Sequence, residues 1–383
     1  MASSIAWIAF GTALVFLAYT YVGYPLLTAV LARVASRPVR QGAIEPTVSF
    51  LIAAHNEEKD IAWKIEETLA LDYPADRREV IVVSDGSTDR TDAIVESYAD
   101  RGVKLFRPEG HPGKTESANQ AVPTTTGEIL IFSDATGHYN RECIRALVRN
   151  FADPTVGLVS GRVTYQYGTS ETASGFRAYQ SFVTAARRSE ARFGTQTSVS
   201  GSIHAIRREL FRPAPTALSF DMVHPLHVAV AGYRTVYEFD ATSEEESREA
   251  PEAEFRARVR IAVRAFTFLP YLLARLPRCR HAAYPFQMVS HKVLRWLSPG
   301  FLLLLAASSL VLAPTSRIAA ALFVAQVVVY LLAAVGWAQR GTGRTSKATA
   351  VPLFFATINL AFAVGFVRWA RGERFGTWTT ERA

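Results

Sequence analysis

The segment GEILIFSDATGHY, residues 127–139, decides the fold class. Within it, the apolar run Ile129–Phe132 leads directly into Ser133 and Asp134 and then into a turn of small residues. A short apolar run bounded by turn residues is typical of a buried β-strand. The strand is therefore predicted to end on a carboxylate, and the next polar position carries Thr136 in place of a second acid.

Two earlier segments repeat this pattern. Residues 47–58, TVSFLIAAHNEE, and residues 79–91, EVIVVSDGSTDRT, are apolar runs that end in polar turns, and the stretches between the strands have helical spacing. Strands that alternate with helices predict an α/β fold, a mostly parallel sheet with helices on both faces. Such sheets bind ligands beyond the C-terminal ends of their strands. One polar strand end is also compatible with a helix cap, but three at one edge predict a ligand site.

Long uncharged segments lie near both ends of the chain. No charged side chain occurs from Met1 to Ala32, and arginines follow from Arg33 onwards. An apolar segment needs about 20 residues to cross a bilayer. This one lacks a basic segment in front and is too long for a cleaved signal peptide, so we expect a membrane anchor. Further uncharged windows predict membrane spans rather than buried core helices, at residues 296–316, 318–339 and 348–367.

The charge distribution predicts which side of the membrane the middle of the chain occupies. The sequence has 42 basic and 34 acidic residues, a net charge of +8. The basic residues gather beside the apolar segments, at residues 33–40, 256–280 and 340–347. Cytoplasmic loops carry such an excess, where they meet anionic lipid. We therefore expect residues 33–295 in the cytoplasm, a multi-pass protein of the inner or plasma membrane, and no nucleic-acid partner.

These features predict four regions. They are an N-terminal membrane anchor at 1–42, a cytoplasmic α/β domain at 43–243, amphipathic membrane-interface helices at 244–295, and about three membrane helices with a tail at 296–383. Residues 244–246 are expected in a solvated loop. Arg256, Arg260 and Arg264 recur every four residues and share one helix face. For Arg256 and Arg264, this favours a basic surface on lipid headgroups. The two cysteines have no CxxC or Cys/His context, so neither a disulfide framework nor a zinc site is predicted.

The polar residues of the α/β domain indicate the type of ligand. Neither a GxGxxG nor a GxxxxGK[ST] motif is present, which excludes the common dinucleotide and P-loop fingerprints. The chain instead offers carboxylates at Asp85 and Asp89 and a glycine-flanked Lys114. A carboxylate at a strand end can accept hydrogen bonds from ribose or bind a divalent cation that carries a diphosphate. This set fits a nucleotide-sugar.

The motifs AAHNEE, VVSDGSTDRT, GKTESANQA, FSDATGHY and SFDMVHPLHVAVAGYRTVYEFDA together give the chain a recognisable pattern. The chain resembles membrane-embedded bacterial family 2 glycosyltransferases, the group that contains hyaluronan, chitin and cellulose synthases. The resemblance implies a GT-A fold, a nucleotide-sugar donor (a UDP-sugar above all), Mg²⁺ or Mn²⁺, and inversion at the anomeric carbon. It also implies a glycan or lipid-linked acceptor in the synthesis of cell-surface or exported polysaccharide.

The resemblance also implies roles for individual residues. Asp221 corresponds to the catalytic base, Arg260 to a cation that stabilises the departing diphosphate, and Asp134 to a metal ligand. The residues implied in donor binding are Ala53, His55, Asn56, Glu57, Asp85, Lys114, Asn119, Ser133, Asp134 and Ala135. One carboxylate facing the acceptor hydroxyl and cations facing the diphosphate are what direct displacement requires.

Two departures from the family pattern carry expectations of their own. Relatives commonly have Asp-x-Asp where this chain has Asp134-Ala135-Thr136, so metal binding is expected to be weakened. Processive synthases have Gln-x-x-Arg-Trp where this chain has Ala257 to Ile261, which keeps only the arginine and predicts short products. A non-catalytic membrane subunit that binds nucleotide or a partner enzyme is the alternative. Thr136 favours it, and the retained acids and cations argue against it.

Overall fold

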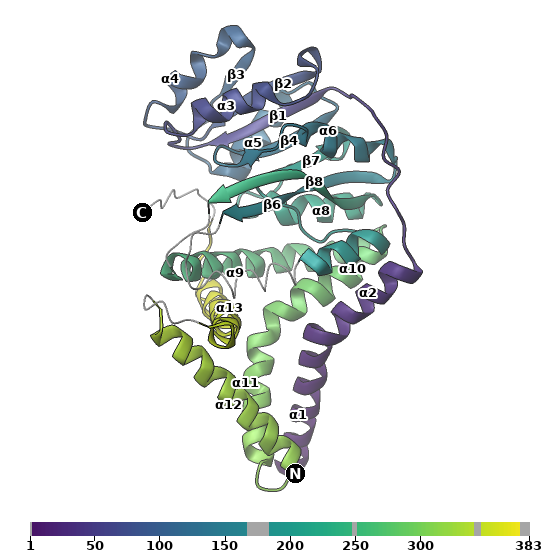
Figure 1. Ribbon diagram of the computed structural model, residues 1–383, viewed down its shortest axis with the longest axis vertical. Coiled ribbons are helices and arrows are strands. Elements are labelled where there is room, and N and C mark those ends of the chain that lie inside the picture. Colours follow the sequence, from purple (N-terminus) through teal and green to yellow (C-terminus); the bar gives the residue numbers. More distant parts are fainter. Residues whose placement is uncertain (1, 167–183, 247–250, 341–345, 376–383) are drawn as a thin grey trace.

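The protein combines an α/β domain with a set of membrane helices beneath it (Figure 1). A computed structural model describes residues 2–166, 184–246, 251–340 and 346–375. In Figure 1 the sheet lies above α9 (Pro251–Leu273), and α1 (Ala2–Ala18), α11 (Leu294–Leu312), α12 (Arg317–Ala338) and α13 (Lys347–Ala370) lie below it. The chain enters the α/β domain from the membrane helices and returns to them afterwards.

In the part of the chain that the structure describes, one mixed sheet of eight strands, in the order β3-β2-β1-β4-β7-β6-β8-β5, forms the centre of the domain. β1 pairs in parallel with β2 and β4, and β2 pairs in parallel with β3, as expected from the alternation of strands and helices. β7 is antiparallel to both β4 and β6. The strands are β1 Val48–Ala54, β2 Arg78–Ser84, β3 Val103–Phe106, β4 Ile129–Asp134, β5 His138–Tyr139, β6 Val156–Gln166, β7 Ile203–Arg207 and β8 Arg234–Glu246.

Helices cover both faces of the sheet, which confirms the predicted layering. α3 (Ile61–Ala70), α4 (Thr91–Glu96) and α6 (Cys143–Val148) pack on one face. α5 (Lys114–Ala121), α8 (Phe220–Val230) and α9 (Pro251–Leu273) pack on the other. Successive side chains of a strand point to opposite faces. In β4, accordingly, Ile129 and Ile131 join the first core and Leu130 and Phe132 the second.

The membrane helices are long and apolar. They comprise α1 (Ala2–Ala18), a π-helical turn at Tyr19–Gly23, α2 (Tyr24–Val34), α10 (Ala283–Gln287), a second π-helical turn at Met288–Val293, α11 (Leu294–Leu312), α12 (Arg317–Ala338) and α13 (Lys347–Ala370). Among the described residues, four helical segments are long and apolar enough to cross a membrane: Ser3–Val34, Ala283–Leu312, Arg317–Ala338 and Lys347–Ala370. All four predicted apolar segments coincide with these helices.

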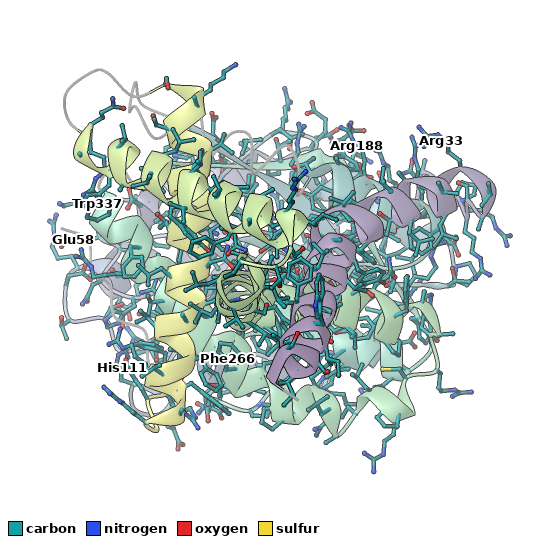
Figure 2. The ribbon with its side chains drawn as sticks, turned by 90° about the horizontal axis from the view of Figure 1, so that it is seen from below. Arg33, Glu58, His111, Arg188, Phe266 and Trp337 are labelled. Atoms are coloured by element: carbon teal, nitrogen blue, oxygen red, sulfur yellow. The ribbon has the colours of Figure 1, made fainter. Side chains whose placement is uncertain are left out.

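α13 lies differently from the other three. Figure 1 shows it end-on just below α9, and Figure 2, turned by 90°, shows it lengthwise while α11 is seen end-on. Its side chains pack along α9, where Phe266 contacts the rings of Phe362, Phe366 and Trp369. A Cβ atom on Gly365 would lie 2.5 Å from the Cβ of Ala262, so the two helices approach as closely as glycine allows. α13 therefore runs across α11 and along α9.

The structure corrects two predicted boundaries. Residues 244–246 are the end of β8, which pairs with β6 (Thr164 opposite Glu244), and not a solvated loop. The predicted domain boundary at 243 therefore falls inside a strand. The interface segment 244–295 is also not uniform: α9 ends at Leu273, and the helix that starts at Ala283 continues into α11. The π-helical turn at Met288–Val293 continues the helix through Lys292. The positive charge of Lys292 therefore does not mark the end of a helix.

Candidate active site

The C-terminal ends of three parallel strands bring the predicted polar residues to one edge. β2, β1 and β4 are neighbours, and Ala53 lies opposite Asp134 in the register of β1 with β4. His55 follows β1, Asp85 follows β2, and Asp134 ends β4. The predicted meeting of three polar strand ends is therefore observed.

Asp85 is held in place by the protein. Its side chain is fully buried, and Oδ1 accepts hydrogen bonds from the Gly113 amide (3.2 Å) and the Ser117 hydroxyl (2.8 Å). The imidazoles of His55 and His111 contact its backbone carbonyl through Nδ1, at 2.7 and 2.6 Å. Since a carbonyl only accepts, both rings donate from Nδ1. The carboxylate predicted to contact the donor is thus covered in this state.

Lys114 and Asp134 meet across the edge of the sheet. Lys114 is the first residue of α5, and its Nζ forms an ion pair with Oδ1 of Asp134 and lies 3.3 Å from the Gly201 carbonyl. The two side chains are 33% and 27% exposed, so both remain within reach of a ligand. The cation and the acid expected at the donor diphosphate are therefore adjacent.

A lysine that the sequence did not single out supports the turn after Asp134. Lys64 is fully buried, donates to Glu67 (3.0 Å) and to the Gly137 carbonyl, and lies 3.3 Å from the centre of the Tyr139 ring. Burial lowers the pKa of Lys64, and the Glu67 carboxylate opposes that effect. The signal in the sequence was a lysine between Ile61 and Ile65, on the apolar face of a predicted helix.

Asp221 begins a helix on the other side of the same region. It follows Phe220 in α8, whose N-cap is Ser219, so Asp221 is not the cap residue. Among the described residues, no hydrogen-bond partner reaches its buried Oδ1. An unpaired buried acceptor is costly, which indicates a ligand function. Asp221 lines one small cavity together with Ala53, Lys114 and Ser133.

The arginines of α9 differ in their surroundings. Arg256 is exposed, whereas Arg260 and Arg264 are half-buried. Burial lowers the pKa of Arg264, and the Asp221 carboxylate acts in the opposite direction. The prediction that Arg264 faces lipid headgroups is therefore wrong, because its turn of α9 is packed against the domain. Nothing in a four-residue spacing distinguishes the buried turn from the exposed one.

Two buried histidines lie at this cavity, His204 in its wall and His224 behind His204. His204 lines it, donates from Nδ1 to the Ser200 carbonyl (2.8 Å), and lies with Nε2 3.3 Å from Nδ1 of His224. Burial lowers the pKa of His204 to about 3, and the charge of Lys114 acts in the same direction. Burial also holds the pKa of His224 well below its usual range. Both rings are therefore neutral at physiological pH, and no motif in the sequence singles them out.

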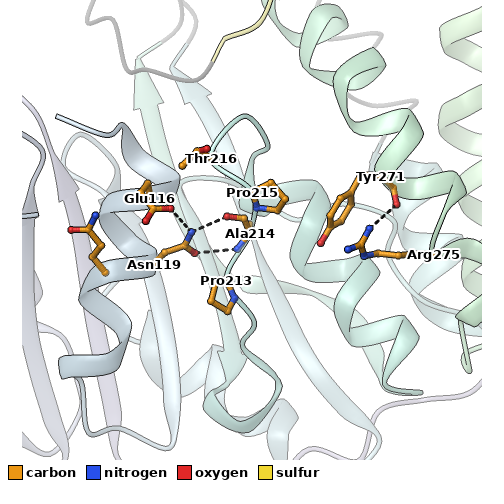
Figure 3. Close-up of a pocket in the computed structure, with 9 residues that line it drawn as sticks. Glu116, Asn119, Pro213, Ala214, Pro215, Thr216, Tyr271 and Arg275 are labelled. Carbon is orange, nitrogen blue, oxygen red and sulfur yellow. Dashed lines mark hydrogen bonds between the residues drawn. The ribbon is translucent and has the colours of Figure 1, made fainter. Parts of the chain in front are cut away.

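Asn119 does not lie at the strand edge. Its amide donates to the Ala214 carbonyl (2.8 Å) and accepts from the Ala214 amide (3.1 Å), so it fixes the 213–216 loop (Figure 3). It lines an open surface hollow of about 580 Å³ that also contains Tyr271 and Arg275 of α9 and its following turn. The structure thus separates Asn119 from Lys114, although both belong to α5.

The remaining predicted residues build the loops around the edge. Asn56 has a left-handed backbone (φ 55°) and accepts from the Thr88 amide at 2.7 Å, which ties the first two strand ends together. The Glu57 amide donates to Thr91 (2.8 Å). Ser133 accepts from the Tyr139 hydroxyl at 2.7 Å, and Ala135 is buried.

Within the part of the chain that the structure describes, no group of three or more His, Cys, Asp or Glu side chains is placed to hold a metal ion. Asp134 is the carboxylate at the end of β4, and Thr136 stands two residues on. Any divalent ion here would therefore take most of its ligands from a bound substrate or water.

Comparison with known proteins agrees with the motifs. Residues 49–213 match the family model described as glycosyl transferase family 2. The chain is 36% identical over 121 residues to a beta-monoglucosyldiacylglycerol synthase of Synechocystis sp., covering 30% of this chain and 25% of that protein. It is 25% identical over 161 residues to a poly-beta-1,6-N-acetyl-D-glucosamine synthase of Staphylococcus aureus, covering 40% and 38%. The matches thus span a quarter to about two fifths of those relatives.

A solved structure resembles nearly the whole chain. The mannosyltransferase PcManGT from Pyrobaculum calidifontis, in complex with GDP-Man and Mn²⁺, superposes with a TM-score of 0.71 at 24% identity. The match covers 95% of this chain and 99% of that one. At this identity the likeness shows the fold. Residues 49–213 therefore match the glycosyl transferase family 2 model, and the α/β sheet with its covering helices has the GT-A fold.

Proposed function

We propose that this chain is a membrane-bound, inverting glycosyltransferase that moves a sugar from a nucleotide-sugar to a glycan or lipid-linked acceptor. One observation carries the proposal. Lys114, which forms an ion pair with Asp134, lines one cavity beside the strand edge together with Asp221, whose Oδ1 has no hydrogen-bond partner among the described residues. A cation for a diphosphate and a base for a hydroxyl are the parts that sugar transfer requires.

The proposed reaction is a single displacement. The acceptor hydroxyl loses its proton to the Asp221 carboxylate as its oxygen forms a bond to the anomeric carbon. The bond from that carbon to the diphosphate oxygen breaks, and its electron pair leaves with the nucleoside diphosphate. Lys114 stabilises the charge of the departing diphosphate, and Arg260, on the same face of α9 as Arg264, is a second candidate for this role.

The residues present fit a divalent cation only in part. Mg²⁺ is commonly held by one or two carboxylates together with substrate phosphates, and Asp134 supplies one such carboxylate next to Thr136. When bound with a donor diphosphate, the ion would help to neutralise the leaving group. The Mn²⁺ in the PcManGT complex supports this assignment.

The names of the relatives support a class of donor and acceptor for the proposed reaction. Their names describe transfer to a diacylglycerol lipid, synthesis of a poly-N-acetylglucosamine and transfer of mannose. These names include different sugars and do not point to a single one. We therefore propose a nucleotide-sugar donor, with a UDP-sugar as the first candidate. We also propose an acceptor that reaches the site along the membrane helices.

The arrangement of α13 supports a specific orientation. With residues 35–282 in the cytoplasm, the segments Ser3–Val34, Ala283–Leu312 and Arg317–Ala338 cross the membrane. A fourth crossing by α13 would carry Arg368, Arg371 and Arg374 to the outside, against the preference of basic residues for the cytoplasm. Because α13 runs along α9 instead (Figures 1 and 2), we propose that it lies at the cytoplasmic interface.

Cysteine labelling tests this orientation. In a variant with Cys143 and Cys279 replaced by serine, Thr315→Cys should react with an impermeant maleimide in intact cells. Asp100→Cys and Gly372→Cys should react only after permeabilisation. Labelling of Gly372→Cys from outside would show that α13 crosses the membrane, and labelling of Asp100→Cys would overturn the whole orientation.

Nucleotide release tests the activity itself. Purified protein with membrane lipid extract should release nucleoside diphosphate from one member of a panel of UDP-, GDP- and dTDP-sugars. Binding of a nucleotide without release, under conditions in which the acceptor is present, would favour the non-catalytic subunit, for which Thr136 in place of an acid is the supporting observation.

A further inference from the structure

The covered carboxylate of Asp85 raises the question of how a nucleotide could reach it. Oδ1 is satisfied by the amide of Gly113 and the hydroxyl of Ser117. Oδ2 lies 3.2 Å from Nδ1 of His111, but that N–H is directed to the Asp85 backbone carbonyl at 2.6 Å. Oδ2 consequently has no hydrogen bond among the described residues. A buried carboxylate oxygen without a donor is unfavourable.

His111 is the side chain that lies between this oxygen and solvent. Its side chain is 40% exposed, while that of Asp85 is fully buried. The ring stacks on His55, with centroids 4.5 Å apart and planes 25° apart. His55 in turn is fixed by its own hydrogen bond to the Asp85 carbonyl at 2.7 Å. His55 is half-buried and His111 is exposed, so His55 is the inner ring of the stack and His111 the outer ring that can move away.

The backbone around His111 is built for this close approach. Gly86 has φ +67°, and a Cβ atom there would lie 3.2 Å from the Cβ of His111. Gly110 and Gly113, on either side of His111, have φ +74° and +89°. Glycine adopts such conformations without the strain that other residues meet. The ring can thus lie directly over Asp85 on a short segment bounded by two glycines.

We propose that His111 occupies the position of the nucleobase in the nucleotide-free protein, so that a base must displace its ring in order to reach Oδ2 of Asp85. The ring N–H of an imide base, as in uracil, thymine or guanine, displaces the imidazole and donates to Oδ2 of Asp85. An ionised carboxylate is an acceptor only. Adenine and cytosine present a ring nitrogen lone pair at the corresponding edge, so they leave Oδ2 unpaired. This inference rests on the proposed function, because it assigns the base subsite of the same nucleotide-sugar site.

Calorimetry on the full-length protein in detergent tests the inference, with UDP, GDP, CDP and ADP as probes and Mg²⁺ present. The wild type should bind UDP or GDP and should bind CDP and ADP more weakly. His111→Ala removes the competing N–H, so the preferred imide nucleotide should bind about tenfold tighter, a change of about 1.4 kcal/mol. His111→Phe, which keeps a ring on His55 but has no N–H, should also bind more tightly, though less so than His111→Ala.

Controls separate the possible failures. Glu109→Gln, at an exposed position of the same loop, should leave every affinity unchanged, and the melting temperature of each variant reports its folding. Equal or weaker binding of UDP and GDP by both His111 variants would overturn the inference, as would CDP or ADP binding as tightly as the imide nucleotides. Absence of nucleotide binding by the wild type would instead contradict the proposed function.

Discussion

Lys114 and Asp134 form an ion pair across the C-terminal edge of the sheet, although they come from a helix start and a strand end. The pair places a cation on the carboxylate that we propose holds the donor and its metal. A bound diphosphate, with or without a cation, offers each partner a new contact. We therefore expect the donor to bind to the protein in which Lys114 and Asp134 are paired, and to exchange this ion pair for contacts with the diphosphate.

Asp134→Asn should weaken binding of the donor nucleoside diphosphate by about tenfold or more, since charged hydrogen bonds are worth about 1.5–3 kcal/mol. Titration calorimetry with and without Mg²⁺ measures the change. Glu128→Gln, at the opposite end of the same strand, is the matched control and should have no effect. Unchanged affinity in Asp134→Asn would remove this residue from the donor site.

The metal requirement should depend on Thr136. Because a threonine hydroxyl is a weaker ligand than a carboxylate, Thr136→Asp should lower the Mn²⁺ or Mg²⁺ concentration that gives half-maximal activity. Metal titration of the chelator-treated enzyme measures this. Full activity of the wild type in excess chelator would show that no divalent ion takes part.

Arg264 is expected to influence Asp221 through its positive charge. Arg264→Gln removes a half-buried positive charge near the carboxylate, so we expect turnover to fall by about tenfold. Nucleotide affinity should stay the same. Arg256→Gln, two turns away on the same helix face and exposed, is the control. Equal effects of the two substitutions would mean that Arg264 has no specific role.

The neutral His204 should make the protein sensitive to acid. The pKa of His204 is about 3 in the folded protein and about 6.5 when unfolded. Between these values the unfolded chain binds a proton that the folded one does not. The free energy of unfolding should therefore fall as pH falls below about 6.5, by up to about 1.4 kcal/mol per pH unit for this group.

Thermal melts between pH 7.5 and pH 4.5 measure this effect. His204→Asn keeps a donor for the Ser200 carbonyl and does not titrate, so it should lose less stability in acid than the wild type. His138→Asn, at an exposed histidine, should behave as the wild type does. Parallel pH dependence in all three proteins would contradict the assignment of the neutral state.

Local patterns were sufficient to predict the framework of this protein. The apolar run before Asp134 and the similar runs within residues 47–58 and 79–91 predict adjacent parallel strands. The length of a strand and the polar residues at its end can be read from a short segment of sequence. The apolar segments near both termini predict membrane helices for the same reason. The strand edge with Asp85 and Asp134 follows from the rule that parallel strands end together.

Features that depend on tertiary packing were not predictable. Arg256 and Arg264 have the same spacing, and only the packing of α9 under the domain makes one exposed and the other half-buried. His111 covers Asp85 because the backbone turns at Gly110 and Gly113, which a sequence pattern does not reveal. Asn119 belongs to the expected motif, but the helix geometry of α5 directs it to the 213–216 loop instead.

The central claim is that Asp221 acts on the acceptor and not on the donor. The most direct test compares Asp221→Asn with the wild type in two assays, donor binding by calorimetry and sugar transfer with the responsive donor. A general base contributes roughly 10²–10⁴-fold to the rate. We predict that Asp221→Asn binds the nucleotide-sugar with unchanged affinity and loses transfer by a factor in that range. Transfer within a few-fold of the wild type, or loss of donor binding, would contradict the account.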